Sequence, residues 1–133
     1  MIIAIFCYYM HIMRNTIKNH KDFLMTDDDA VAKCAYCLIR ARHIRFPGDP
    51  QYGLVATKRT FRHATERNRA KRLLREWLRI NTRQMRDDLD YVIIARPAIL
   101  TATRDEGVLA MNRALHYLKR TMPPAPKSDE TGI

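Results

Sequence analysis

The chain has 133 residues, of which 47% are hydrophobic and 29% charged, which suits one globular domain and argues against general disorder. Its 24 lysines and arginines outweigh 14 aspartates and glutamates, giving a formal net charge of +10. An excess of this size indicates a polyanionic partner, most often nucleic acid, with an anionic membrane surface as the alternative, and small acidic substrates rarely require it.

The first 13 residues form an apolar N-terminal extension. The run is shorter than the roughly 20 residues that span a bilayer, and it lacks the basic start and cleavage site of a signal peptide. Met10 and Met13 stand just before the first basic residue, Arg14. We interpret residues 1–13 as the product of a start codon assigned too far upstream, with a short membrane-touching tail as the alternative, and expect no membrane partner.

We expect residues 14–121 to form a single domain, and the proline-containing residues 122–133 to form a flexible tail. The first element is a short amphipathic helix over residues 16–25, because its apolar side chains recur at helical spacing. Asp27–Asp29 then indicate a solvated turn, since adjacent carboxylates cannot all converge on one metal ion.

Three strands are predicted from alternation and from apolar runs bounded by turn residues. The first covers residues 34–42 and precedes a turn rich in Pro and Gly at residues 45–50. The second, residues 52–57, is expected to be the other arm of a long hairpin. The third, residues 90–96, is nearly continuous in apolar residues, which is typical of a central strand.

Cys7, Cys34 and Cys37 are the three cysteines, and an odd number argues against a secreted disulfide scaffold and favours the reducing cytoplasm. Cys34 and Cys37 have the spacing of half a zinc knuckle, but no second pair of Cys or His completes four ligands. A strand through both residues would also point their sulfurs to opposite faces. We therefore expect ordinary buried or half-buried thiols and no metal.

The longest helix signal covers residues 62–86, which contain no Gly or Pro, and a last helix is expected over residues 105–120. One stripe of the last helix is predicted to face the core: Val108, Leu109, Met111, Leu115 and Leu118. Together the elements predict an α/β sandwich of order α-β-β-(β)-α-β-α, in which helices pack on a small mixed sheet of three to four strands.

Positive charge is concentrated in the long helix and the loop before it. Residues 58–86 contain 11 basic and two acidic residues, or +9 of the +10 of the whole chain. At 100° per residue one arc of the helix is apolar: Ala70, Leu73, Leu74, Trp77, Leu78 and Ile80. The opposite arc is basic: Arg67, Asn68, Arg69, Lys71, Arg72, Arg75, Arg79 and Arg83. Such a surface repels itself unless an anion neutralises it, and a solvated face supported by an Arg72–Glu76 pair is the alternative.

The start of this helix is suited to bind phosphate groups. The segment Arg67-Asn68-Arg69 lies in its first turns, where backbone N–H groups and the helix dipole also attract anions. Guanidinium groups bind phosphate oxygens in pairs, and the amide can donate and accept at a sugar or base edge. Lys58 and Arg59, at the end of the preceding strand, extend the same surface. His63 has no nucleophile or carboxylate partner at an informative spacing in the sequence. We therefore expect it to serve at the start of the helix, and we assign no catalytic residue.

Three segments together resemble the protein subunit of bacterial ribonuclease P: Gly53-Leu-Val-Ala-Thr-Lys-Arg59, Arg67-Asn-Arg-Ala-Lys-Arg-Leu-Leu-Arg-Glu76 and Tyr91-Val-Ile-Ile-Ala-Arg-Pro97. The second segment is the most specific of the three, and the resemblance covers about residues 16–120. It implies the ribonuclease P protein fold, in which parallel strands are joined through the basic helix by a left-handed βαβ crossover, against the general right-handed rule.

In that family the RNA subunit carries the catalytic site and its Mg²⁺ ions, and the protein is an accessory with no metal held by its side chains alone. The resemblance implies that this chain binds the ribonuclease P catalytic RNA and the 5′ leader of precursor tRNA, and so supports endonucleolytic 5′ maturation of tRNA. The implied RNA-binding residues are Lys58, Arg59, Arg67, Asn68, Arg69, Lys71, Arg72 and Arg75. Phe23 and Tyr36 are implied to line a leader cleft between the first helix and the sheet, where aromatic rings can stack on bases; core packing is the alternative for Phe23.

Two positions depart from the family pattern. Thr60–His63 lacks the glycine that usually precedes the basic helix, and Asp27 stands where a second cleft aromatic is common, so we expect the turn and the leader contacts there to differ. The competing interpretations are a ribosomal or other structured-RNA-binding protein with no role in cleavage, and a protein-only nuclease, which needs clustered carboxylates or histidines where this chain has scattered acids. We expect no DNA partner, because nothing resembles a helix-turn-helix pair.

Overall fold

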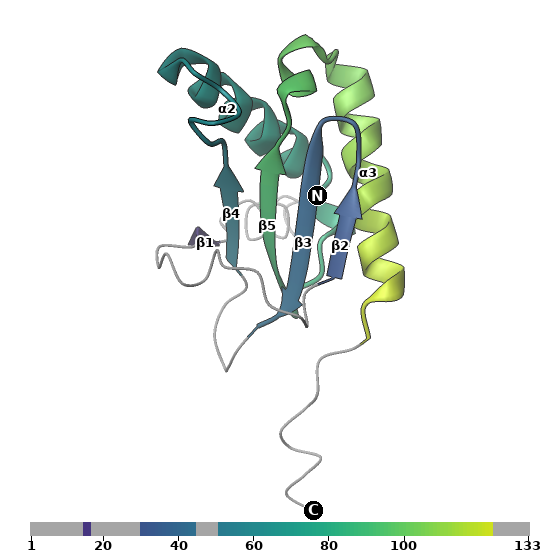
Figure 1. Ribbon diagram of the computed structural model, residues 1–133. Helices are drawn as coiled ribbons and strands as arrows, with labels where there is room; N and C mark the ends of the chain where they lie inside the picture. The colour runs from purple at the N-terminus through teal and green to yellow at the C-terminus, as the bar shows by residue number, and fades with distance from the viewer. Residues whose placement is uncertain (1–14, 17–29, 45–50, 124–133) are drawn as a thin grey trace, which may run out of the picture.

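The computed structural model describes residues 15–16, 30–44 and 51–123, and Figure 1 shows its sheet and its two long helices. The sheet has the strand order β1-β4-β5-β3-β2, with β1 Asn15–Thr16, β2 Ala30–Lys33, β3 Cys37–His43, β4 Gln51–Val55 and β5 Leu89–Ala95. The helices are α2 Ala64–Ile80 and α3 Arg104–Thr121, with 3₁₀ turns η2 Thr82–Gln84 and η3 Pro97–Thr101. The predicted α/β class is confirmed, and the sheet has five strands where three to four were expected.

Several sequence predictions lie outside the described residues. They concern the extension 1–13, the first helix with Phe23, the turn Asp27–Asp29, the turn 45–50 and the tail from residue 124 onward. Thr16 was predicted to start the first helix, but it ends the two-residue strand β1, which pairs in parallel with β4.

β5 is the central strand, as its continuous apolar sequence predicts. It pairs in parallel with β4 and antiparallel with β3, so that Tyr91 lies between Tyr52 and Ala41. Every residue of β5 except Ile94 is buried, and the strand has a paired neighbour on each side. Parallel neighbours require a crossover connection, and the chain from β4 to β5 crosses through α2. The left-handed sense of this crossover stays a prediction.

The hairpin predicted between residues 34–42 and 52–57 is wrong, because β3 pairs with β2 while β4 lies on the other side of β5. The hairpin is formed by residues 30–43 themselves. Lys33 pairs with Leu38, and the chain reverses within the two residues between Cys34 and Cys37. The alternation keeps its two-residue period on both sides of the reversal but shifts by one residue across it, since Ala32 of β2 and Ile39 of β3 both belong to the core.

One core lies between the sheet and helices α2 and α3, which cover the same face of the sheet (Figure 1). The largest fully buried side chains on the helices are Leu74, Trp77, Met111, Leu115 and Leu118, and those on the sheet include Ile39, Leu89, Tyr91 and Ile93. Two predicted core positions are wrong. Ile80 and Leu109 are 41% and 51% exposed, because each lies at the margin of its helix's apolar stripe.

α2 ends at Ile80, before the predicted end of the helix, because polar side chains bind the carbonyls of its last turn. Asn81 Nδ2 donates to the carbonyl of Trp77 at 3.0 Å and to that of Val108 in α3 at 3.1 Å. Thr82 Oγ1 also donates to carbonyls of the last turn. Side chains that occupy these carbonyls compete with continued helix, so neither Gly nor Pro is needed to end it.

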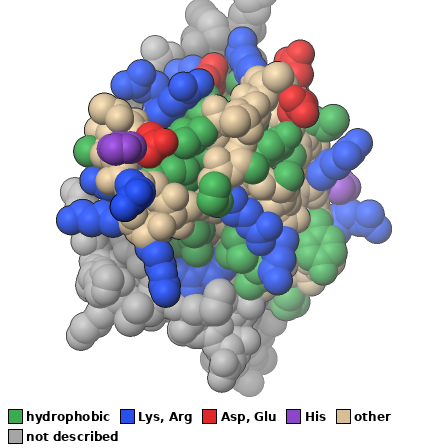
Figure 2. All heavy atoms as spheres, turned by 45° about the horizontal axis from the view of Figure 1, so that its top comes forward, with side chains coloured by type: hydrophobic (Ala, Val, Ile, Leu, Met, Phe, Trp, Pro, Cys, Tyr) green, Lys and Arg blue, Asp and Glu red, His purple; other side chains and the backbone are tan. Residues whose placement is uncertain are grey.

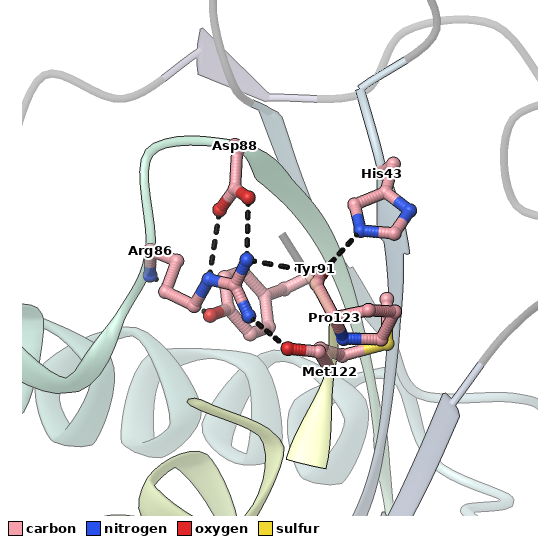
Figure 3. Close-up of polar contacts among 6 residues, drawn as sticks. All are labelled: His43, Arg86, Asp88, Tyr91, Met122 and Pro123. Atoms are coloured by element: carbon pink, nitrogen blue, oxygen red, sulfur yellow. Dashed lines mark hydrogen bonds and ion pairs between the residues drawn. The ribbon is translucent and has the colours of Figure 1, made fainter. Parts of the chain in front are cut away.

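Arg86 joins the start of β5 to the end of α3 (Figure 3). Its guanidinium binds the Asp88 carboxylate, with Nε 2.8 Å from Oδ1, and donates to the carbonyl of Met122 at 2.6 Å and to that of Pro123 at 3.2 Å. Its backbone N–H donates to the hydroxyl of Tyr91 at 2.9 Å. The sequence places Arg86 among the basic residues of segment 58–86, but in the structure its side chain holds parts of the fold together.

We expect Arg86→Ala to lower the free energy of unfolding by about 1–3 kcal/mol, because a carboxylate and two carbonyls lose a charged donor that is 16% exposed. Urea unfolding measures this change. Arg83→Ala is the matched control, since Arg83 is exposed and should change stability by less than about 0.5 kcal/mol. Equal stability of the two variants would contradict the structural role.

Candidate nucleic-acid interface

The turn between β4 and α2 places Lys58 and Arg59 next to the start of the helix. The sequence predicts both at the end of a strand, but β4 ends at Val55, so both lie in the turn beyond it. Both side chains are exposed to solvent. The turn therefore adds two cations to the surface formed by α2.

Threonine side chains close this turn. The backbone N–H of Phe61 donates to the carbonyl of Thr57 at 2.9 Å, and the N–H of Thr60 donates to Thr57 Oγ1 at 3.2 Å. Phe61 is 2% exposed and anchors the turn in the core. In the described part of the chain no residue has a positive φ, so this turn forms without the glycine that usually precedes the basic helix in the family pattern.

The first turn of α2 uses His63 and Arg67 to hold the loop. His63 is the N-cap, and its backbone N–H donates to Glu66 Oε1 at 3.3 Å, which confirms the predicted helix-start role. Arg67 Nη1 donates to the carbonyl of Phe61 at 2.9 Å and to that of Arg62 at 3.2 Å. Arg67 is half-buried, so its guanidinium supports the loop at the same time as it contributes charge.

The buried face of α2 determines where its arginines point. The buried residues of the helix are Ala70, Leu74, Trp77 and Leu78, which confirms most of the predicted apolar arc. Leu73 is half-buried beside them. The opposite side of the helix is therefore directed to solvent, as its sequence pattern predicts.

Four exposed arginines on that side form a surface that we call the basic ridge: Arg69, Arg72, Arg75 and Arg79. They are spaced three or four residues apart, so they are neighbours along one side of the helix and extend over roughly 15 Å. Asn68 is exposed next to the ridge, and Lys71 is half-buried at its margin. Figure 2 brings this end of the molecule forward, and Lys and Arg side chains surround much of the face that it shows.

The two carboxylates of α2 have contact partners outside the basic ridge. Glu66 accepts the N–H of His63, and Glu76 Oε1 lies 3.5 Å from Nε of Arg104 on α3. The Arg72–Glu76 pair considered in the sequence analysis is therefore replaced by a contact between helices. The charge of the ridge remains available to an external anion.

Tyr36 lies at the junction of the β2–β3 hairpin with both helices. Its ring meets the ring of Trp77 edge-on at a centroid distance of 6.0 Å, and its hydroxyl donates to Glu106 Oε2 at 3.3 Å. Desolvation and the neighbouring carboxylate raise the pKa of Tyr36, while hydrogen bonds from the Thr103 side chain and backbone lower the pKa of Glu106. The assignment of Tyr36 to a leader cleft stays a prediction.

Two arginines on the sheet were missed by the sequence analysis. Arg40 and Arg42 alternate with the core residues Ile39 and Ala41 along β3, so they lie on the face of the sheet opposite to α2 and α3. Both are nearly buried, at 5% and 9% exposure, and Arg42 pairs in register with Asp90. Arginine at alternate positions of an apolar strand is the signal that could have found them.

The prediction that Cys34 and Cys37 point to opposite faces is wrong. Their sulfurs lie 3.4 Å apart, because the chain reverses between them and places the two residues directly across the hairpin. Within the described ranges no group of three or more His, Cys, Asp or Glu side chains could hold a metal ion. No helix in those same ranges is long and apolar enough to cross a membrane.

The chain is similar in sequence to a known protein family. The family model described as Ribonuclease P matches residues 13–119. The ribonuclease P protein component of Chromobacterium violaceum is 40% identical over 68 residues, or 51% of this chain and 55% of the relative. That of Pseudomonas entomophila is 34% identical over 84 residues, or 63% and 62%. The alignments thus span less than two thirds of these relatives.

The fold has a counterpart among solved structures. The RNase P protein of Staphylococcus aureus superposes with a TM-score of 0.65 at 20% sequence identity, covering 78% of this chain and 94% of that one. At this level of identity the likeness concerns the fold.

Proposed function

The chain belongs to the ribonuclease P protein family, and we propose that it is the protein subunit that assists a catalytic RNA in removing 5′ leaders from precursor tRNA. The observation that carries the proposal is the basic ridge, which lies inside the matched residues, is exposed, and has no carboxylate partner from its own helix. In this proposal the protein binds RNA in the bacterial cytoplasm, and the chemistry belongs to the RNA.

The RNA-binding surface has two parts in this proposal. Arg69, Arg72 and Arg75 of the ridge bind phosphate oxygens of the ribonuclease P RNA, since guanidinium groups form paired, charge-assisted hydrogen bonds. Lys58 and Arg59 extend the contact from the turn. Three further residues complete the set taken from the family: Arg67, Asn68 and Lys71.

The magnesium ions of the reaction belong to the RNA in this proposal. In support of this, the two acids of α2 contact the backbone N–H of His63 and the side chain of Arg104. Leader binding by Phe23 and Tyr36 is part of the proposal by resemblance to the family. For Tyr36 the support is its half-exposed position at the end of the hairpin.

A structured-RNA-binding protein without a role in cleavage is the second candidate, because the ridge would serve any folded RNA equally well. Precursor-tRNA cleavage by a bacterial ribonuclease P RNA, with and without this chain, separates the two. At low Mg²⁺ the RNA and its substrate repel each other, so protein cations should have their largest effect there.

We expect this chain to raise the cleavage rate at low Mg²⁺ by at least about tenfold, a change of about 1.4 kcal/mol in activation free energy. The Arg69→Ala, Arg72→Ala double variant should lose the stimulation. Absence of stimulation with the RNA of the same bacterium would reject the subunit assignment, and sedimentation with ribosomes would then test the second candidate.

A further inference from the structure

We propose that Cys34 and Cys37 form a thiol–disulfide exchange site for small anionic disulfides, in which Cys34 attacks and Cys37 resolves the mixed disulfide. The pair lies at the closed end of the β2–β3 hairpin and flanks Tyr36, but neither thiol is among the residues proposed to bind RNA. The proposal therefore stands apart from the proposed function.

The backbone brings the two thiols together. Cys34 N–H donates to the carbonyl of Cys37 at 2.9 Å, and the sulfurs lie 3.4 Å apart while both cysteines are free. Residues that flank a two-residue hairpin loop have Cα atoms within about 7 Å, which a disulfide can bridge. Oxidation to a disulfide thus needs a small movement of the side chains.

The two thiols differ in access. Cys37 is 0% exposed and belongs to the core, whereas Cys34 is half-buried. Cys34 also lines an open groove of about 680 Å³ between β2 and α3. A reagent from solvent can therefore reach Cys34 directly, and Cys37 only through Cys34.

The hydrogen bonds favour the same order of reaction. The Cys37 thiol donates to Cys34 and lowers its pKa to about 6, with help from backbone hydrogen bonds at Tyr36 and Cys37 and from the charge of Arg96. The same contact, together with burial, raises the pKa of Cys37. Because a thiolate is the attacking species, Cys34 is the nucleophile at neutral pH.

The groove indicates the class of substrate. Lys33 and Arg113 are its charged lining residues, and both are exposed cations. Tyr117, which is 55% exposed, adds an aromatic surface beside them. A small disulfide that carries carboxylates, such as oxidised glutathione, complements this lining in charge and can bring its sulfur to Cys34.

The reaction has two balanced steps. The Cys34 thiolate attacks one sulfur of the small disulfide, forming a mixed disulfide and releasing one small thiolate, which takes up a proton. Cys37 then loses its proton and attacks the sulfur of Cys34, forming the Cys34–Cys37 disulfide and releasing the second thiolate. Two electrons pass from the protein dithiol to the small disulfide, and a reducing cytoplasm returns the pair to its free state.

The test treats the full chain with oxidised glutathione, blocks the remaining thiols, and follows products by intact mass and peptide mapping. We expect the wild type to form the Cys34–Cys37 disulfide, and Cys37→Ser to accumulate a glutathione adduct at Cys34. In Cys34→Ser, the glutathione adduct at Cys37 should form at least about tenfold more slowly than the Cys34 adduct of Cys37→Ser, because Cys37 is buried. The wild-type rate should rise with pH and be half-maximal near the pKa of Cys34, about 6.

Charge variants test the groove. Lys33→Gln with Arg113→Gln should slow the reaction with oxidised glutathione by roughly tenfold and speed that with the cationic disulfide cystamine. Equal slowing with both disulfides would overturn the anionic preference. A wild type that retains the mixed disulfide, or a Cys34 that reacts no faster than in urea-unfolded chain, would overturn the exchange site.

Discussion

Replacing Arg69 and Arg72 with alanine is expected to weaken binding of ribonuclease P RNA by at least about tenfold. Both side chains are exposed and lie three residues apart on the basic ridge, so each can bind a phosphate. Each lost phosphate contact should also lower the slope of log affinity against log salt by about one unit, because fewer counterions are released. Fluorescence anisotropy over a series of KCl concentrations measures both quantities.

The matched control removes the same charge from another helix. Arg113 and Arg120 are exposed on α3, so Arg113→Ala with Arg120→Ala lowers the net charge equally and leaves the ridge intact. Equal losses of affinity in the two double variants would mean that overall charge, and not the ridge, determines binding. Arg67 is avoided here because its guanidinium holds the carbonyls of Phe61 and Arg62, so its alanine variant would also disturb the loop.

The buried face of α2 could be predicted from the sequence, because it depends only on the periodicity of apolar residues within one helix. Ala70, Leu74 and Trp77 recur at helical spacing, and burying them leaves the arginines outside. The central position of β5 could be predicted for a similar reason, since the unbroken apolar run Tyr91–Ala95 is typical of a buried central strand.

Strand pairing could not be predicted in this way. Turn residues at 45–50 indicate that the chain changes direction, but they do not say which strand lies beside β3. β5, which enters only after α2, takes that place and separates β3 from β4. The reversal between Cys34 and Cys37 changes only the phase of the alternation, by one residue, because the period is the same on both sides of the turn.

Side-chain contacts between different elements also could not be predicted from the pattern within one element. Glu76 lies four residues from Arg72 in the sequence, but in the fold Arg104 of α3 is its partner. Asn81 ends α2 by binding carbonyls on two helices, which depends on where α3 packs. Such contacts exist only after the helices have been placed on the sheet, so a pattern within one helix carries no sign of them.

Trp77→Ala is expected to lower the free energy of unfolding by about 3–5 kcal/mol, because its fully buried indole fills the space between α2 and α3. Gly107 of α3 lies against this ring, and a Cβ at that position would overlap Trp77 ring carbons. Gly107→Ala should therefore cost about 1–3 kcal/mol from overpacking, although alanine favours a helix by about 1 kcal/mol. Urea unfolding measures both changes.

The double variant distinguishes this contact from a general intolerance of α3 to substitution. With Trp77 replaced by alanine, the overlap is gone, so adding Gly107→Ala should become neutral or stabilising by up to about 1 kcal/mol. Leu109→Ala, at an exposed position of the same helix, should change stability little in either background. If Gly107→Ala lowers the free energy of unfolding equally with and without the indole, the Trp77 ring does not require glycine at position 107. The packing of α3 on α2 described above is then wrong.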